Sequence, residues 1–260
     1  MEKVTSADGT AIAYERYGSG QPVILVGGAL CDRAAYVELA KALAADFTAV
    51  TYDRRGRGDS GNATPYAVAR EVEDIGALVT ALGGVAAIYG HSSGAALVAE
   101  AAASGLPFTK VVLHEPPYGP DDEESQRESD EGGEAVIRLL DEGRRREAVE
   151  TFLQLAGMPE EAAKQWAGEP GMDELAPTLE YDFAVVGNTT KGGTVPFDLI
   201  AKVTQPTLAL CGTASPEFMI DAARVVAKTL PGGRYQELEG QDHVVPTEVL
   251  APVLRNFLTV

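Results

Sequence analysis

The sequence predicts an α/β fold in which a mostly parallel sheet is flanked by helices, with one helical segment inserted into the series. Short, continuous apolar runs such as Val23–Val26 are typical of strands that are buried on both faces. Amphipathic helical segments alternate with these runs, and such alternation indicates a parallel sheet covered on both faces. Between residues 118 and 200 no strand of this series is visible. We therefore expect a core of residues 1–117 and 201–260 and an inserted helical cap, or lid, of residues 118–200.

The first half of the chain supplies most of the expected core. Asp8-Gly9 is a hairpin turn signal between two runs that suit antiparallel strands. Asp32 can cap the helix that follows Val23–Val26, and Pro65 can start a helix that runs to about Leu82. The other elements expected here are strands at Lys3–Ser6, Ala11–Tyr17, Thr48–Tyr52, Ala86–Tyr89 and Val111–Leu113, and a helix at Ser92–Ser104.

The expected cap opens with the charge run Asp121–Glu131, which predicts a solvated loop. Helical stretches follow it, and the series then resumes with strands at Thr207–Cys211 and Arg234–Leu238 and helices at Met219–Leu230 and Val249–Leu258. Ligands of such sheets bind at the carboxyl ends of the strands. One site should therefore form where several loops meet, namely those after Val26, Tyr89, Leu113, Cys211 and Leu238.

Charge and composition exclude several kinds of partner. The formal net charge is −18, which repels phosphate backbones and anionic lipid, so we expect neither nucleic acid nor membrane as a partner. Cys31 and Cys211 each lie beside an apolar run, which predicts buried packing residues rather than a disulfide. No Cys/His spacing resembles a metal site, and no signal-peptide or membrane-spanning run is visible. We expect a cytoplasmic protein that needs no metal or organic cofactor, and its oligomeric state stays open.

The strongest chemical motif is Gly90-His91-Ser92-Ser93-Gly94, which fits the pattern G-x-S-x-G. A predicted strand precedes it, and a predicted helix of small residues follows it. A sharp strand-to-helix turn holds a serine hydroxyl exposed, and only residues without bulk fit beside it. The helix then directs its first N–H groups at the site. The sequence therefore predicts Ser92 as a nucleophile, against the alternative of a simple Gly/Ser turn.

Over nearly its whole length the chain resembles the α/β-hydrolase superfamily. Asp53–Ser60 looks like the family's D-x-R-G-x-G-x-S loop, and Val26-Gly27-Gly28-Ala29 lies where the family usually has a His-Gly-x oxyanion loop. The resemblance implies an α/β-hydrolase fold with residues 118–200 as its lid, and Gln241-Asp242-His243 lies where the family has its histidine. These motifs are specific for the fold and much less specific for the substrate.

A serine hydroxyl needs a base to accept its proton, and the chain has three histidines. His91 lies inside the turn and His114 ends a strand, whereas His243 follows the final strand and can return to the site. We expect His243 to be the general base, with a capping or surface histidine as the alternative. The oxyanion hole needs two N–H groups: one should be that of Ser93, and the resemblance places the other at Ala29. Gly27 and Gly28 as plain turn glycines remain an alternative.

The acid of the triad is where the sequence departs from the family. The family usually carries it in a G-x-x-D stretch, and here Ser215 takes that place and cannot offer a charge to imidazolium. Some members of the superfamily place the acid after the strand that follows the elbow helix, which here is Glu115. We expect Glu115 to be the acid. Glu217, Asp242, or a backbone carbonyl with no acid at all, stay open.

The nucleophile type narrows the chemistry. Epoxide hydrolases and haloalkane dehalogenases of this superfamily use an aspartate at the elbow, whereas Ser92 suits acyl transfer. We expect a carboxylesterase-like serine hydrolase that acts on a small ester, thioester or lactone through an acyl-enzyme. A non-hydrolytic enzyme of the same fold (a lyase, cyclase or acyltransferase) and an inactive binding protein are the alternatives. The identity of the substrate stays open.

Overall fold

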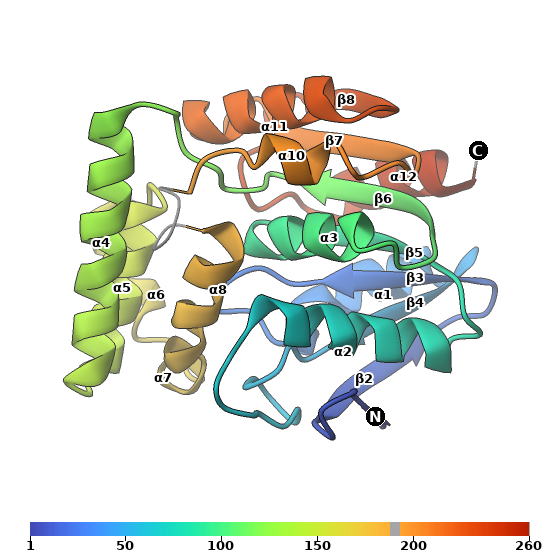
Figure 1. Ribbon diagram of the computed structural model, residues 1–260, viewed down its shortest axis with the longest axis horizontal. Helices are drawn as coiled ribbons and strands as arrows, with labels where there is room; N and C mark the ends of the chain where they lie inside the picture. The colour runs from blue at the N-terminus through green and yellow to red at the C-terminus, as the bar shows by residue number, and fades with distance from the viewer. Residues whose placement is uncertain (188–192, 260) are drawn as a thin grey trace.

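The computed structural model describes residues 1–187 and 193–259. Its sheet has eight strands in the order β1-β2-β4-β3-β5-β6-β7-β8, with helices on both faces (Figure 1). The strands are β1 (Glu2–Thr5), β2 (Ala11–Tyr17), β3 (Gln21–Val26), β4 (Phe47–Tyr52), β5 (Ala86–His91), β6 (Phe108–His114), β7 (Thr207–Gly212) and β8 (Gly233–Leu238). β1 pairs antiparallel with β2, and β2 with β4, while the pairs from β4 to β8 are parallel. The predicted fold class is confirmed.

Alternate residues of the central strands belong to two apolar clusters, one on each face of the sheet. In β3, Val23 and Leu25 belong to one cluster, and Ile24 and Val26 belong to the other. This is why the strand is continuously apolar, since both of its faces are covered. The first cluster includes residues of α1 (Val37–Leu43) and α12 (Thr247–Thr259), and the second includes residues of α2 (Val68–Ala81), α3 (Ser93–Ala103) and α11 (Glu217–Thr229).

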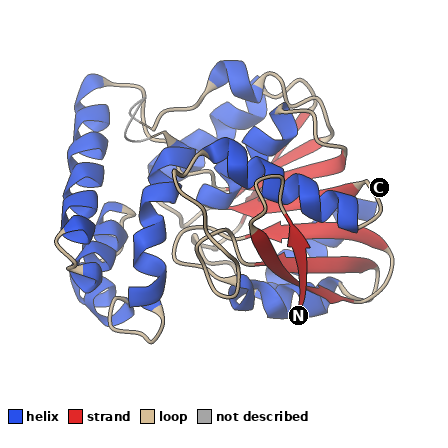
Figure 2. Cartoon of the chain, turned by 60° about the horizontal axis from the view of Figure 1, so that its bottom comes forward, coloured by secondary structure: helices blue, strands red, loops and turns tan. Residues whose placement is uncertain are grey.

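The described part of residues 118–200 is mainly helical. Its helices within residues 123–175 stand beyond the end of the sheet to which the β6 arrow points, whereas the helix at residues 197–200 packs against α3 and α11 of the core (Figure 1). Figure 2 shows the helices of residues 123–175 as a group without strands among them. The described helices of the whole segment are α4 (Glu123–Asp141), α5 (Arg145–Leu155), α6 (Glu160–Trp166), α7 (Met172–Leu175), α8 (Leu179–Val186) and α10 (Phe197–Ile200), with a 3₁₀ turn at Ala176–Thr178. A third apolar cluster joins several of them to Leu30, in the loop after β3. Residues 188–192 of the expected cap lie outside the described residues.

Two local predictions are wrong. Pro65 does not start a helix, because α2 begins at Val68 after an extended Ala67. The run Asp121–Glu131 is not mainly a loop, because α4 begins at Glu123. The Asp122 side chain accepts a hydrogen bond from the Ser125 N–H and so caps this helix, and acidic residues in a first turn favour helix formation. The apolar residues by which α4 packs come later, at Val136, Leu139 and Leu140. Within the described residues, no helix combines the length and apolar character needed to cross a membrane.

Candidate active site

Ser92 occupies a strained turn between β5 and α3. Its backbone has φ 57° and ψ −131°, a conformation that L-residues rarely adopt. The flanking glycines are required by close approach: a Cβ on Gly90 would lie 2.4 Å from the Gly94 carbonyl oxygen, and one on Gly94 would lie 2.5 Å from the Val26 carbonyl oxygen. The spacing of G-x-S-x-G thus follows from packing of the turn against β3. The side chain of Ser92 projects from this turn and is partly exposed.

The strained backbone of the described chain is concentrated at this end of the sheet. Among residues 1–187 and 193–259, the non-glycine residues with positive φ are Leu30 (54°), Ser92 (57°) and Glu115 (49°). Ser92 and Glu115 directly follow β5 and β6, and Leu30 lies in the loop after β3. Such strain costs free energy and gathers at functional sites, where the surrounding structure holds it in place.

The register of β5 and β6 places two predicted site residues side by side. His91 and His114 are paired across these strands, so the next residues, Ser92 and Glu115, leave adjacent strand ends together. The Ser92 N–H donates to the His114 carbonyl at 2.9 Å. The Glu115 N–H donates to the Leu210 carbonyl of β7 at 2.9 Å, which fixes the turn that follows β6.

Glu115 meets His243 directly. Its Oε2 lies 2.5 Å from His243 Nδ1, and its Oε1 accepts hydrogen bonds from the Gly212 N–H at 2.7 Å and from the Ser215 hydroxyl at 2.6 Å. Burial by itself would raise the pKa of Glu115, but the hydrogen bonds from His243, Gly212 and Ser215 outweigh it and hold the pKa below its usual value. The carboxylate is therefore ionised, fully buried and fixed by three donors.

The other candidates for the acid lie elsewhere. Glu217 is exposed in the first turn of α11, and Asp242 accepts a hydrogen bond from the Val244 N–H at 3.0 Å. Ser215, at the place of the family's usual acid, donates its hydroxyl to Glu115 rather than to His243. Of these residues, Glu115 is the one that the fold brings to the imidazole.

The rings of all three histidines lie in a row at this site, tilted against one another with His91 in the middle, and the sequence did not predict this arrangement. The ring centroids of His91 and His243 are 4.4 Å apart, and those of His91 and His114 are 4.8 Å apart. His91 Nε2 donates to the His243 carbonyl at 2.8 Å, and its Nδ1 accepts from the Tyr36 hydroxyl at 2.9 Å. Burial lowers the pKa of His91 to about 3 and the pKa of His114 well below its usual value. These two rings are neutral supports for His243. Their places beside Ser92 and Glu115 in the sequence were the only available signal.

The loop after β3 lies against the nucleophile. A Cβ on Gly28 would lie 2.8 Å from the Ser92 Cβ and 3.4 Å from its Oγ, so the backbone itself faces the hydroxyl there. Ala29 follows and is partly exposed, while Ser93 begins α3 on the other side. In the described part of the chain no hydrogen bond joins the Ser92 hydroxyl to the His243 ring. The described residues also contain no group of three or more His, Cys, Asp or Glu side chains placed to hold a metal ion.

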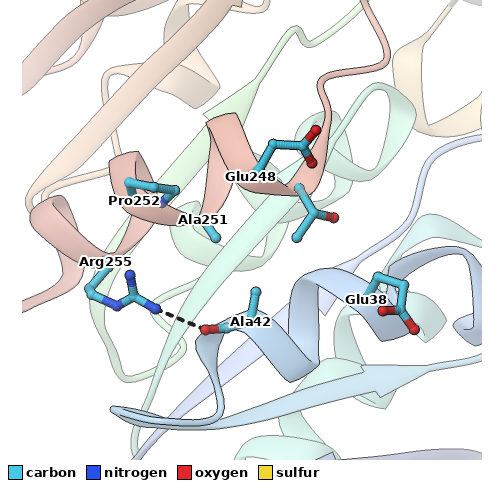
Figure 3. A pocket seen from close by; sticks show the side chains of 7 residues that line it. Glu38, Ala42, Glu248, Ala251, Pro252 and Arg255 are labelled. Atoms are coloured by element: carbon cyan, nitrogen blue, oxygen red, sulfur yellow. Dashed lines mark hydrogen bonds between the residues drawn. The ribbon is translucent and has the colours of Figure 1, made fainter.

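A hollow in the surface lies apart from these residues. It measures about 640 Å³ between α1 and α12 and is lined by Glu38, Ala42, Thr247, Glu248, Ala251, Pro252 and Arg255 (Figure 3). The Arg255 guanidinium donates to the Ala42 carbonyl there at 2.8 Å. None of its lining residues is among those predicted for catalysis.

The sheet order and the strained serine turn are those of the α/β-hydrolase class of folds. The model of the α/β hydrolase family matches residues 23–253, and the chain therefore belongs to this family. An α/β hydrolase from Sphaerobacter thermophilus is 45% identical, with a TM-score of 0.88 over 99% of this chain and 100% of that one.

More distant solved structures share the fold. A thermophilic esterase from Thermogutta terrifontis is 21% identical, with a TM-score of 0.72 over 99% of this chain and 97% of that one. An esterase from Exiguobacterium antarcticum is 19% identical, with a TM-score of 0.78 over 99% of both chains. No curated protein matches the sequence.

Proposed function

We propose that this protein is a carboxylesterase-like serine hydrolase that cleaves a small ester, thioester or lactone through an acyl-enzyme on Ser92. The observation that carries the proposal is the juxtaposition of a strained, partly exposed Ser92 with the pair formed by the buried carboxylate of Glu115 and the partly exposed imidazole of His243. The esterase activity of the two distant structural relatives agrees with it.

The proposed mechanism begins at the carboxylate. Glu115 accepts the hydrogen bond of His243 Nδ1–H, which leaves Nε2 unprotonated as the general base. Nε2 takes the proton of Ser92 as its oxygen attacks the substrate carbonyl, and the imidazolium is stabilised by the charge of Glu115. His243 then gives this proton to the leaving group. Water, activated by the same base, releases the acyl group and restores Ser92.

The oxyanion of each tetrahedral intermediate is held by the N–H groups of Ala29 and Ser93. Gly28 lies against Ser92, which supports the N–H of the next residue, Ala29, as a donor beside the attacked carbon. Ser93 is the first residue of α3, so its N–H has no partner within the helix and stands at the positive end of the helix dipole. The removal of one such donor typically lowers kcat by about 10²- to 10³-fold.

The surroundings of the loop after β3 support an apolar acyl group. Leu30 belongs to the apolar cluster of the cap, and Ala29 packs against the same cluster together with Phe152, Leu153 and Met172. A short alkyl chain bound beside Ala29 would contact this apolar surface, and its burial away from water would favour binding. The ground for the non-hydrolytic alternative is the serine in the acid's usual place at position 215, and the hydrogen bond between His243 and Glu115 removes this ground.

Labelling of the nucleophile tests the proposal. A fluorophosphonate should modify the purified protein once, and peptide mass spectrometry should find the adduct on Ser92. With a p-nitrophenyl ester of a short acid, a trapped acyl group should appear on the same residue. Folded protein that takes no label and turns over none of a panel of short esters, thioesters and lactones would overturn the proposed function.

A further inference from the structure

A second ionic cluster lies buried beside the nucleophile turn and joins the cap to the core. Asp182 of α8 accepts from Arg54 Nη1 at 2.6 Å through its Oδ1 and from Arg57 Nη2 at 2.7 Å through its Oδ2. All three side chains are at most 2% exposed. Glu71 of α2 balances the second positive charge by a bidentate pair with Arg54 at 2.7 and 2.8 Å.

Arg57 holds the loop that lies against Ser92. Its Nη1 donates to the Gly28 carbonyl at 2.6 Å and to the Cys31 carbonyl at 3.0 Å. The carbonyl of Gly28 and the N–H of Ala29 belong to one peptide group, which is planar and trans, so the two point in opposite directions. Fixing the Gly28 oxygen therefore fixes the direction of the Ala29 N–H.

Asp182 also reaches the other side of the site. Its Oδ1 accepts the hydroxyl of Ser93 at 2.7 Å, and the N–H of this same residue is the second proposed oxyanion donor. Burial by itself would raise the pKa of Asp182, but the charges of Arg57 and Arg54 hold it below its usual value. One ionised carboxylate on the cap thus contacts Ser93 directly and reaches the loop of Ala29 through Arg57.

The segment that carries Asp182 is tied to the core at further points. Tyr181 stacks on Tyr66 with ring centroids 3.9 Å apart, and its hydroxyl accepts from Asn62 Nδ2 at 2.7 Å. Figure 1 shows α8 next to α3, between the core and the cap helices α4, α5 and α6. In the family pattern D-x-R-G-x-G-x-S, the arginine of the motif is Arg55, while Arg54 and Arg57 fill its open positions. The residues that link the cap to the oxyanion loop therefore stand at positions that the motif leaves open.

We infer that Arg57, held by Asp182 of the cap, is a positioning residue that orients the Ala29 N–H for the oxyanion. This inference rests on the proposed serine mechanism. The packing of α8 against the core and the assembly of the oxyanion hole are then coupled. The Asp182 carboxylate, which joins α8 to the core, also holds the Arg57 guanidinium that orients the Ala29 N–H.

If this cluster were purely structural, substituting Asp182 would lower the stability of the protein without affecting the reaction. A second buried ion pair in the chain serves as a matched control. Arg55 and Asp74 form a bidentate pair at 2.7 and 2.8 Å, at most 1% exposed, that starts from the same loop. Their hydrogen bonds go to Arg70 and Asp8 and not to the loop after β3. Asp182→Asn and Asp74→Asn each remove one charge from a buried pair, and both should lower the melting temperature.

The experiment measures kcat and KM for a p-nitrophenyl ester and Ki for a trifluoromethyl ketone of similar size, which forms a tetrahedral adduct with an oxyanion. Asp182→Asn should lower kcat about 10- to 10²-fold, which is part of the effect of losing a whole donor. KM should change little and Ki should rise in parallel with the loss in kcat. Asp74→Asn should leave kcat and Ki at the wild-type values.

Arg57→Lys keeps the charge but cannot span Gly28, Cys31 and Asp182 together, and it should show the same kcat loss as Asp182→Asn. If Asp182→Asn fails to fold, the Arg57→Lys variant still tests the inference. The inference is overturned if the folded variants keep wild-type kcat and Ki while their melting temperature falls as in Asp74→Asn. A wild-type protein without fluorophosphonate labelling or ester turnover would instead refute the proposed function, so the two failures are distinguishable.

Discussion

Glu115 Oε2 lies 2.5 Å from His243 Nδ1, although 128 positions separate the two residues in the chain. The pair forms because β6 lies between β5 and β7: Glu115 leaves β6 beside Ser92, and Gly212 at the end of β7 donates to its carboxylate. The serine at position 215 completes this arrangement by donating to the same carboxylate. The proposed acid thus lies one strand along the sheet from the family's usual position, and the loop at that position donates hydrogen bonds to it.

Glu115→Gln should lower kcat for a short p-nitrophenyl ester by about 10²- to 10⁴-fold, because the imidazolium would lose its charged partner and the ring could adopt the wrong tautomer. Ser215→Ala removes one donor to Glu115 and should reduce kcat far less. Glu217→Gln and Asp242→Asn serve as controls, since neither carboxylate meets His243. A near-normal kcat in folded Glu115→Gln would refute the assignment of the acid.

Ser92→Ala should lower kcat by about 10⁶-fold, as expected when a triad loses its nucleophile. The fold should be retained, since the change removes only the hydroxyl of a partly exposed residue; circular dichroism and the melting temperature check this. Ester turnover within tenfold of the wild type would exclude Ser92 as the nucleophile.

Gly94→Ala should destabilise the protein by about 1–3 kcal/mol, because the added Cβ would lie 2.5 Å from the Val26 carbonyl oxygen and force the elbow away from β3. Gly232→Ala is the control, since a Cβ there meets nothing within 4 Å. Urea unfolding of both variants gives the comparison. Equal stability of the two would mean that the elbow does not require a glycine at this position.

His91 should make the fold sensitive to acid. Burial and, to a smaller extent, the nearby His243 lower its folded pKa to about 3, against the raising effects of the hydrogen bond to the His243 carbonyl and of Glu115, whereas the unfolded value is near 6.5. Below pH 6.5 the unfolded chain binds more protons at this residue, so its contribution to stability falls as the pH drops towards 3. Between pH 7 and pH 5 this loss is about 2 kcal/mol.

His91→Gln removes this titration and keeps an amide that can donate to the His243 carbonyl. The stability of the variant relative to the wild type should therefore improve by about 2 kcal/mol between pH 7 and pH 5, as measured by urea unfolding at both values. His114 and the carboxylates are present in both proteins and largely cancel in the difference. Parallel pH profiles for the two proteins would show that His91 is not held neutral by the fold.

Local patterns in the sequence determined the fold class and the position of the elbow. The apolar runs of β3, β5 and β7, and the glycines on either side of Ser92, act over a few residues, and their physical causes are burial on two faces and close backbone approach. Local patterns were weaker where two local tendencies compete. The run Asp121–Glu131 combines solvated charges with an aspartate that can cap a helix. The hydrogen bond from the Ser125 N–H to this Asp122 side chain and the packing of later residues stabilise most of the run as a helix.

The tertiary structure decided which distant residues meet. The sequence left Glu115, Glu217 and Asp242 open as partners of His243, because the choice depends on the order of strands in the sheet and on the register that pairs His91 with His114. It contained no sign that Asp182 would reach Arg57, 125 positions away, since a buried ion pair between a cap and a core forms only when the two pack together. Short-range steric limits and hydrophobic periodicity depend on neighbouring residues and can be predicted from the sequence, whereas contacts between distant elements depend on how the whole chain packs.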